Sequence, residues 1–423
     1  MRVSTSQIYN IANIGMKQAQ GAVVKTEEQI ATNKRILSPA DDPVAATTIL
    51  QLKQELARIE QYGKNINLAE NSLQLEEATL KSVISLVQRM QEIAVSAGNT
   101  AVMTSADYQA FAAEVDSRIQ ELLNLQNTRN ASGQYIFGGY QGSSAPFSAD
   151  GSGHYSYSGD QGQLRLQASA TVTVAVTDSG QRLFMDIPSS HNTFTTVANP
   201  ANRAQPAASI SAGQVIDQEE FDKLFPEDLV ITFNTPNPDA NYTITERHSG
   251  KVIVADQPHI PGQAIEVKGI RFHIDGVPNP PTTVMVDGVP TPVPGDSFFV
   301  ESTNKQGLLT TLSRFSDAMR NVKDNPESKA EVAQIIAQTL TNLENAVTQI
   351  SSVQGEVGAR LNTLESAKDL NLDTELFSKR VLSQLEDLDL AEASTRLKME
   401  TLVLTAVQQS FVKVSQMSLF SYL

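Results

Sequence analysis

The chain has 423 residues, a formal net charge of -15 and no cysteine, and 40% of its residues are hydrophobic. This length predicts two or three domains. The acidic balance argues against a nucleic-acid partner and against docking on anionic membranes, because both attract basic surfaces. The missing cysteine excludes disulfides, thiolate metal sites and cysteine nucleophiles.

The N-terminal segment does not resemble an export signal of the cleaved kind. Residues 1–20 contain no apolar run of signal-peptide length and no small-residue cleavage site. No part of the chain approaches 18 uninterrupted apolar residues, so no membrane insertion is expected. A weak helical stripe runs instead through Ile8, Ile11 or Ala12, Gly15, Ala19, Ala22 or Val23, Thr26 and Ile30.

A long helix is predicted from Pro43 to the Gly98-Asn99 pair. Asp42 is a favourable N-cap, and proline is tolerated in the first turn. No proline occurs between residues 44 and 145. A seven-residue repeat, typical of a coiled-coil seam, runs through Leu52, Ile59, Ile66, Leu73, Leu80, Val87 and Ala94. A second helix is expected from Thr104, whose spacing to Asp107 fits a capping box, to about Arg129.

The C-terminal region repeats this organisation. Asn325-Pro326 begins a predicted helix whose seam is Ile336, Leu343, Ile350, Val357 and Leu364. A break is expected at Asp369 to Thr374. A final helix then carries Leu390, Leu397, Leu404 and Phe411, with Ala393, Val407 and Val414 beside them. Each seam needs an amphipathic partner, so the two helical arms are expected to meet.

The middle of the chain changes to a period of two. Fourteen of the 18 prolines fall between residues 166 and 300. Strands are predicted around Leu164 to Val176 and around Tyr242 to Val254. Asp275-Gly276 and Asp287-Gly288 are each typical of hairpin turns. The predicted fold is therefore α+β: a long coiled-coil-like helical bundle made by the N- and C-terminal arms, with a β-rich inserted domain.

Three domains follow from these boundaries. Residues 1–40 and 380–423 form the terminal helices. Residues 41–165 and 301–379 form a helical bundle with a β-hairpin region. Residues 166–300 form a β-rich, surface-exposed insert.

Four segments in the two arms resemble the flagellin family of bacterial flagellar subunits. They are Thr32 to Ala46, Gln91 to Thr100, Tyr135 to Tyr140 with Ala145 to Phe147, and Leu385 to Ala393, and the chain ends in Ser418 to Leu423. The segment Tyr-Ile-Phe-Gly-Gly-Tyr at 135–140 favours a subunit of the hook–filament junction over a filament subunit. The resemblance covers about 60% of the chain and leaves out the insert.

The resemblance implies a structural role without catalysis. It implies export through the flagellar type III apparatus without a cleaved signal peptide, a cytoplasmic export chaperone, and an extracellular location at the junction. Its implied partners are ten further copies in a ring of eleven, the neighbouring hook-associated protein 1, and flagellin. The terminal helices would form the inner tube. Intersubunit packing is expected of the apolar residues of these helices: Ile8, Ile11, Ile30, Leu390, Leu397, Leu404, Phe411, Val414, Leu419 and Phe420.

The sequence shows no organised catalytic or metal-binding motif, so no cofactor is expected. The five histidines are scattered over the insert and its approach, without zinc-ligand spacing. Ser302 and Lys305 match S-x-x-K but lack the motif's partners. The acidic cluster Glu386, Asp387, Asp389 and Glu392 is interpreted as a solvated face or as intersubunit pairing, in preference to a calcium site.

Two other functions remain open. One is a flagellin filament subunit. The other is a secreted carbohydrate-binding or hydrolytic protein with the insert as its active module, which would need clustered carboxylates or aromatic platforms in a cleft.

Overall fold

The computed structural model describes residues 5–99, 101–149, 154–234, 241–286 and 289–420. The described chain is α+β, with long helices at both ends and strands between them, which confirms the predicted fold class. It divides into two compact units. One consists of residues 1–66, 168–172 and 365–423, and the other of residues 67–167 and 173–364. The predicted three-domain boundaries stay predictions.

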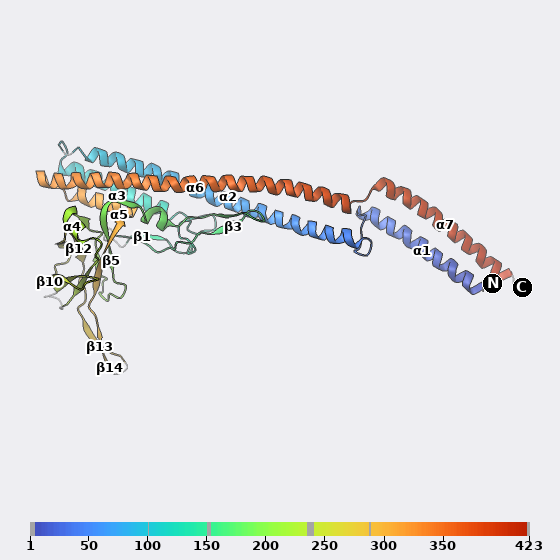
Figure 1. Cartoon of the computed structure of the whole chain (residues 1–423), viewed down its shortest axis with the longest axis horizontal. Helices are drawn as coiled ribbons and strands as arrows, with labels where there is room; N and C mark the ends of the chain where they lie inside the picture. Colours follow the sequence, from blue (N-terminus) through green and yellow to red (C-terminus); the bar gives the residue numbers. More distant parts are fainter. Residues whose placement is uncertain (1–4, 100, 150–153, 235–240, 287–288, 421–423) are drawn as a thin grey trace. The chain divides into compact units, whose positions relative to one another are not determined.

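In the first unit the two ends of the chain lie side by side. Helix α1 (Thr5–Thr32) packs along helix α7 (Leu390–Phe420) (Figure 1). The rings of Tyr9 and Phe411 meet with centroids 5.1 Å apart. The predicted meeting of the two arms is therefore confirmed for their terminal helices. Ala12 is half-buried whereas Ile11 is 66% exposed, which settles the choice at that position of the stripe.

Helix α2 (Pro43–Ala97) begins and ends where the sequence predicts. The backbone N–H of Ala45 donates to Asp42 Oδ1 over 3.0 Å, so Asp42 caps the first turn. The five seam residues from Ile66 to Ala94 are each at most 1% exposed. The seam is buried at Ile59, Ile66, Leu73, Leu80, Val87 and Ala94, and Leu52 is half-buried.

Three of the longer helices begin in the second unit. Helix α3 (Ser105–Gln126) has the predicted capping box, with Thr104 and Asp107 bonded reciprocally. It packs on α5 (Leu308–Arg320), where Ser316 Oγ donates to Asp116 Oδ1 over 2.6 Å. Helix α6 (Pro326–Glu386) buries its whole predicted seam, Ile336, Leu343, Ile350, Val357 and Leu364.

The predicted break at Asp369 to Thr374 is wrong. Helix α6 continues through these residues to Glu386, and α7 begins only at Leu390. Residues 369–374 contain neither proline nor glycine, so their polar character alone does not end a helix. The actual break is at Asp387 to Asp389. There Asp389 Oδ1 accepts from the backbone N–H groups of Ala391 and Glu392 and caps α7.

The β-rich region lies entirely in the second unit apart from one short loop. Its main sheet has the order β10-β9-β8-β15-β5, and a second sheet has the order β11-β12-β6, with β7 also pairing β12. The elements of the main sheet are β5 (Pro188–Ala198), β8 (Leu229–Phe233), β9 (Asn241–Glu246), β10 (Val252–Pro258) and β15 (Ser297–Lys305). Those of the second are β6 (Ser209–Ile210), β7 (Gln214–Val215), β11 (Ala264–Val267) and β12 (Ile270–Asp275).

Smaller elements complete the region. They are the pairs β1 (Phe147–Ala149) with β2 (Tyr155–Tyr157), β3 (Arg165–Gln167) with β4 (Thr173–Ala175), and β13 (Thr282–Val286) with β14 (Val289–Val293), the π-helical turn η1 (Gln181–Met185) and the helix α4 (Gln218–Leu224). The predicted strands around 164–176 and 242–254 are thus present. The two main sheets and α4 enclose one core built around Phe194, Phe221, Phe233, Phe272 and Phe298.

The two Asp-Gly pairs behave differently. Strands β13 and β14 pair from Val286 and Val289 outward, so the hairpin predicted around Asp287-Gly288 is confirmed, although these two residues lie outside the described part. The hairpin predicted at Asp275-Gly276 is wrong, because β12 pairs with β6, β7 and β11 and not with the next strand. Gly276 has a φ of +88°, and a Cβ there would lie 3.1 Å from Ala208 Cα, so the glycine ends β12 at a close chain approach.

The β-rich region enters and leaves through adjacent strands. Strand β5 begins at Pro188 and its partner β15 ends at Lys305, and these two residues face each other in the ladder. The backbone N–H of Gln306 then donates to Ile187 O over 2.8 Å. The region from 188 to 305 is therefore a closed insertion whose two ends meet.

A buried arginine fixes this insertion to α5. Arg314 is 7% exposed, and its Nη atoms donate to Thr193 Oγ1, Gln306 Oε1, Phe194 O and Ala212 O at 2.7 to 3.0 Å. Burial lowers the pKa of Arg314 to about 10. The hydrogen bonds offset the cost of burying the charge.

Candidate assembly surface

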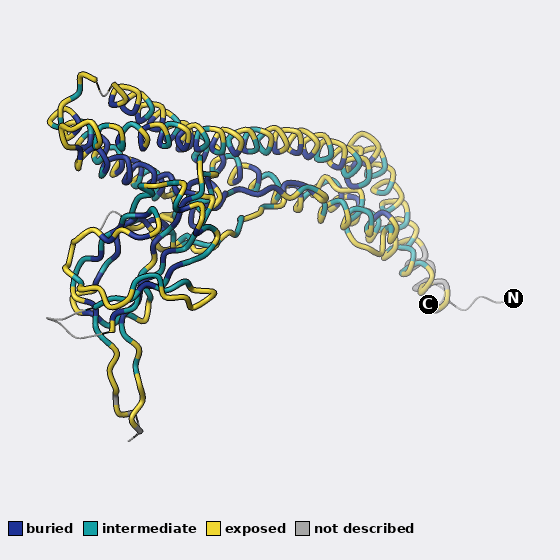
Figure 2. Tube along the Cα trace, turned by 60° about the vertical axis from the view of Figure 1, so that its left-hand side comes forward, coloured by how far each residue is buried: buried dark blue, intermediate teal, exposed yellow. Residues whose placement is uncertain are grey.

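The terminal helices bury few of their apolar side chains within the chain. On α1, the buried residues are Val23, Thr26 and Gln29, and on α7 Ala393 is fully buried. In Figure 2 the described residues of both helices are coloured mostly as exposed or intermediate. A pair of helices with so little buried surface is marginal in water. It therefore requires further apolar contacts to be stable.

The predicted packing residues occupy different positions on this pair. Leu390 is 50% exposed and Ile11 66% exposed, whereas Ile30, Leu397, Leu404 and Phe411 are half-buried. The side chains of Ile8, Val414, Leu419 and Phe420 lie outside the described residues. Phe411 is thus held partly by Tyr9 of the same chain. The role of the whole set between subunits stays a prediction.

Other exposed apolar side chains were not predicted. On α7, Met399 is 62% exposed, Leu402 67% and Val403 47%. On the last part of α6, the exposed set is Leu370, Leu372, Leu376 and Phe377. Single exposed apolar residues are ordinary, but a series along two consecutive helices is typical of an interaction surface. The i, i+4 spacing of Leu372 and Leu376 would have indicated this set if the helix had been continued through 369–374.

Backbone contacts connect the end of α1 to the end of α6. The N–H of Arg35 donates to Glu386 O over 2.7 Å, and the N–H of Leu388 donates to Asn33 O over 3.3 Å. Arg35 Nη2 reaches Leu385 O over 2.8 Å. The segment after α1 therefore forms a joint with the α6–α7 break, although some 350 residues separate the two in the sequence.

Glu386 is the charged centre of this joint. Its side chain is 11% exposed, and its Oε1 lies 2.7 Å from Lys34 Nζ and 3.0 Å from Lys53 Nζ. The hydrogen bond from Lys34 is the main cause that lowers the pKa of Glu386. The interpretation of the acidic cluster as a solvated face or an intersubunit pair is therefore wrong for Glu386, which pairs within the chain.

Asp41 stabilises the other side of the same joint. Its carboxylate accepts from Lys25 Nζ over 2.5 Å and from the backbone N–H groups of Leu37 and Ser38. These bonds, the one from Lys25 first, lower the pKa of Asp41 to about 2. The turn after α1 is thus held by one carboxylate through three donors.

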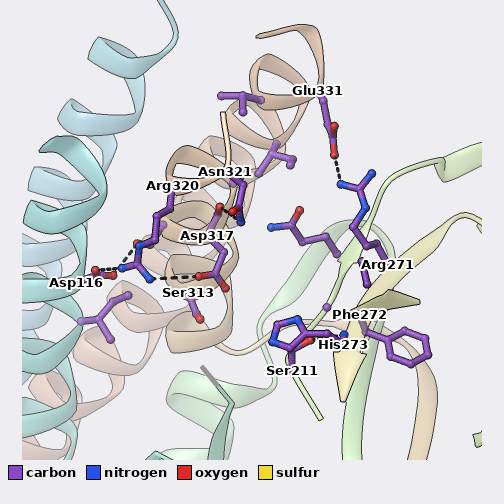
Figure 3. Close-up of a pocket in the computed structure, with 18 of the residues that line it drawn as sticks. Asp116, Ser211, Arg271, Phe272, His273, Ser313, Asp317, Arg320, Asn321 and Glu331 are labelled. Atoms are coloured by element: carbon purple, nitrogen blue, oxygen red, sulfur yellow. Dashed lines mark hydrogen bonds and ion pairs between the residues drawn. The ribbon is translucent and has the colours of Figure 1, made fainter. Parts of the chain in front are cut away.

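A polar cleft of about 820 Å³ in the second unit lies between α3, α5, α6 and β12 (Figure 3). Its charged groups pair with one another. Arg320 contacts Asp116 and lies 3.9 Å from Asp317, and Arg271 Nη1 lies 2.8 Å from Glu331 Oε1. Burial in the cleft raises the pKa of Asp317. Ser316 also lines the cleft, and its hydroxyl donates to the same Asp116 carboxylate that Arg320 contacts. These contacts hold the cleft walls together.

The two residues of the S-x-x-K match, Ser302 and Lys305, do not contact each other in the fold. Both residues lie on β15. Ser302 Oγ donates to Glu227 O over 2.6 Å, and Lys305 Nζ lies 3.5 Å from Asp186 Oδ2. The two side chains are engaged separately, so the S-x-x-K spacing does not make a Ser–Lys pair. Among the described residues no group of three or more potential metal ligands occurs, and no helix is long and apolar enough to cross a bilayer.

Comparison with known protein families assigns both arms. The family model for the bacterial flagellin N-terminal helical region matches residues 3–142, and that for the C-terminal helical region matches residues 340–423. Together they cover just over half of the chain.

The chain belongs to the flagellin family. Within that family it is 32% identical to flagellar hook-associated protein 3 of Escherichia coli over 204 residues, which is 48% of the chain and 62% of that protein. It is 32% identical to the Salmonella typhimurium protein of the same name over 189 residues, 45% of the chain and 58% of that protein. The chain thus matches about three fifths of the length of these curated relatives.

A solved structure extends this likeness to the fold. The crystal structure of flagellar hook-associated protein 3 from Legionella pneumophila is 27% identical, with a TM-score of 0.53 over 80% of this chain and 98% of that one. The similarity to hook-associated protein 3 therefore holds in both sequence and fold.

Proposed function

We propose that this flagellin-family chain is a structural subunit of the bacterial flagellum that connects the hook to the flagellin filament. The observation that carries the proposal is the similarity to hook-associated protein 3 in sequence and fold, together with a terminal helix pair that leaves a series of apolar side chains exposed. Such a surface is completed by neighbouring subunits. The work is burial and shape, without turnover.

The finer details of assembly belong to the same proposal. The subunit forms a ring of eleven copies between hook-associated protein 1 and the first turns of flagellin, with the terminal helices as the inner tube. It reaches this extracellular position through the flagellar export apparatus without a cleaved signal peptide. A cytoplasmic chaperone holds the C-terminal helix before export.

Position and abundance distinguish this role from that of flagellin. Immunogold labelling of isolated flagella, with antibody against residues 188–305, is expected to mark one band where the hook meets the filament. Flagellin in the same preparation is expected to label the whole filament and to be in large excess on a gel. Label along the entire filament would identify the chain as a filament subunit instead. Detection of the chain in the growth medium and not on the flagella would favour a secreted binding protein.

A further inference from the structure

The hairpin β13–β14 stands apart from the sheets of the insertion. Its strands pair with each other from Thr282 opposite Val293 to Val286 opposite Val289, and within the described part of the chain neither strand joins another sheet. It projects from the β-rich region, away from the helices of its unit (Figures 1 and 2). An isolated two-stranded hairpin is only marginally stable. A further strand would therefore stabilise it.

Prolines close one edge of this hairpin. Pro290 and Pro292 lie opposite Met285 and Thr283. A proline has no N–H, so it fits only where the strand does not donate to its partner. Both residues of such a pair direct their backbone polar groups away from each other. The outer edge of β14 therefore offers carbonyls without donors at these positions, and it cannot extend a ladder.

The edge of β13 is open by the same reasoning. Thr283 and Met285 carry N–H groups that point outward, so this edge offers two donors and two acceptors centred on position 284. Thr283 is exposed and Met285 is 66% exposed. An exposed edge strand of this kind is a template for pairing with another chain.

The most suitable complement for this edge is the same strand from a second copy. In an antiparallel arrangement, Thr283 faces the second copy's Met285 and the reverse, so each outward donor meets an acceptor. The chain carries a net charge of -15, which keeps copies apart, but residues 281–294 contain one charged residue, Asp287.

The two edge strands of the main sheet, β10 and β5, are less suitable for pairing with another strand. Strand β10 has two register shifts, and Asp256 within it has a φ of +48°. The edge of β5 is engaged by α6, where Asn342 Oδ1 accepts from the N–H of Ser190 and Asn345 Nδ2 donates to Pro188 O. Bulges and covering groups both prevent strand addition.

We propose that the β13 edge is a self-association site through which two copies of the free chain join their hairpins into one antiparallel four-stranded sheet. The interface is smaller than a standard protein interface, so the association is weak and concentration-dependent. It involves the free chain in solution, whatever the arrangement in the flagellum.

Cysteine cross-linking tests the pairing, because the natural chain has no cysteine. In the antiparallel arrangement, residue 284 of one copy lies opposite residue 284 of the other as a non-hydrogen-bonded pair. The Cα atoms of such a pair are about 4.5 Å apart, a distance that a disulfide spans. The purified full-length V284C variant is expected to form disulfide dimers under mild oxidation. The control is T291C, directly opposite on the same hairpin but on the closed strand. The V284C dimer is expected to form about tenfold faster, because pairing raises the local thiol concentration.

A second variant tests whether the ladder is used. Adding Met285→Pro to V284C removes an outward N–H at a position that tolerates proline, as Pro290 shows on the facing strand. The cross-linking advantage over T291C is then expected to be lost. Equal rates for V284C and T291C would overturn the proposal, and so would a V284C dimer unaffected by Met285→Pro. Cross-linking that appears only when flagella or other proteins are added would replace the second copy by another partner.

Discussion

The carboxylate of Glu386 shows how a single residue connects distant parts of this sequence. It bonds Lys34 and Lys53, and both lysines precede it by more than 300 residues. The sequence showed an acidic cluster at this place but not its partners, because no local pattern indicates which lysines the fold brings near. Asp389 could be predicted from the sequence, since an aspartate immediately before the first residue of a regular apolar stripe is a common N-cap.

Glu386→Gln is expected to destabilise the free chain by about 1 kcal/mol at pH 7, the order of a charge-assisted pair that is partly shielded from water. The pKa of Glu386 is lowered from 4.5 by the lysines, so its stabilising contribution is present above pH 4.5 and is lost as the pH falls through the lowered value. Urea unfolding at pH 7 and at acid pH measures both effects. The control is Glu60→Gln, at an exposed pair on α2.

A difference between E386Q and the natural chain that persists unchanged at low pH would contradict this account. It would mean that Glu386 acts through packing and not through its charge.

At the scale of elements, most helices followed from local signals. The caps at Asp42 and Thr104 and the seven-residue seams gave both the starts and the buried faces of α2, α3 and the first part of α6. The break before α7 was predicted in the wrong place. The contacts of residues 386–388 with the turn after α1, which hold this break, leave no local pattern in the sequence. Polarity at residues 369–374 was the wrong signal. Most of these residues are exposed on a helix that continues, and Asn371 is buried, with its Nδ2 donating to Ala168 O over 2.8 Å.

The exposed apolar series on α7 is tested with Leu402→Gln. The free chain is expected to lose less than about 0.5 kcal/mol of stability, because Leu402 is 67% exposed. Assembly is expected to weaken by about 2 kcal/mol per contact, or roughly thirtyfold, if neighbours bury this side chain. Thermal unfolding checks the first effect, and the amount of variant in purified flagella checks the second.

Thr405→Gln is the matched control, an exposed polar residue one turn away. Equal incorporation of both variants would place Leu402 outside the assembly surface.

At the scale of the whole molecule, the α+β class and the meeting of the terminal helices could be predicted, since helical arms with unsatisfied seams need each other. The topology of the insertion could not. Its main sheet places β15, the last strand in the sequence, between β5 and β8. Such long-range pairings leave no local trace. The same pairing makes the insertion separable, because Ile187 and Gln306 are hydrogen-bonded where it begins and ends.

Replacing residues 188–305 by a short Gly-Ser linker is expected to leave export and incorporation into flagella largely intact. Arg314→Met accompanies the excision, because the cut removes oxygens to which Arg314 donates. Motility and immunoblots of purified flagella measure the result. A complete loss of incorporation by a variant whose helical content is unchanged would show that the insertion carries the essential function.

The most direct test of the junction role is deletion of the gene in its own bacterium, followed by electron microscopy of the cells and an assay of flagellin in the medium. We expect hooks without filaments and flagellin shed into the medium, with filaments restored when the gene is returned. Full-length filaments on cells that lack this chain would contradict it.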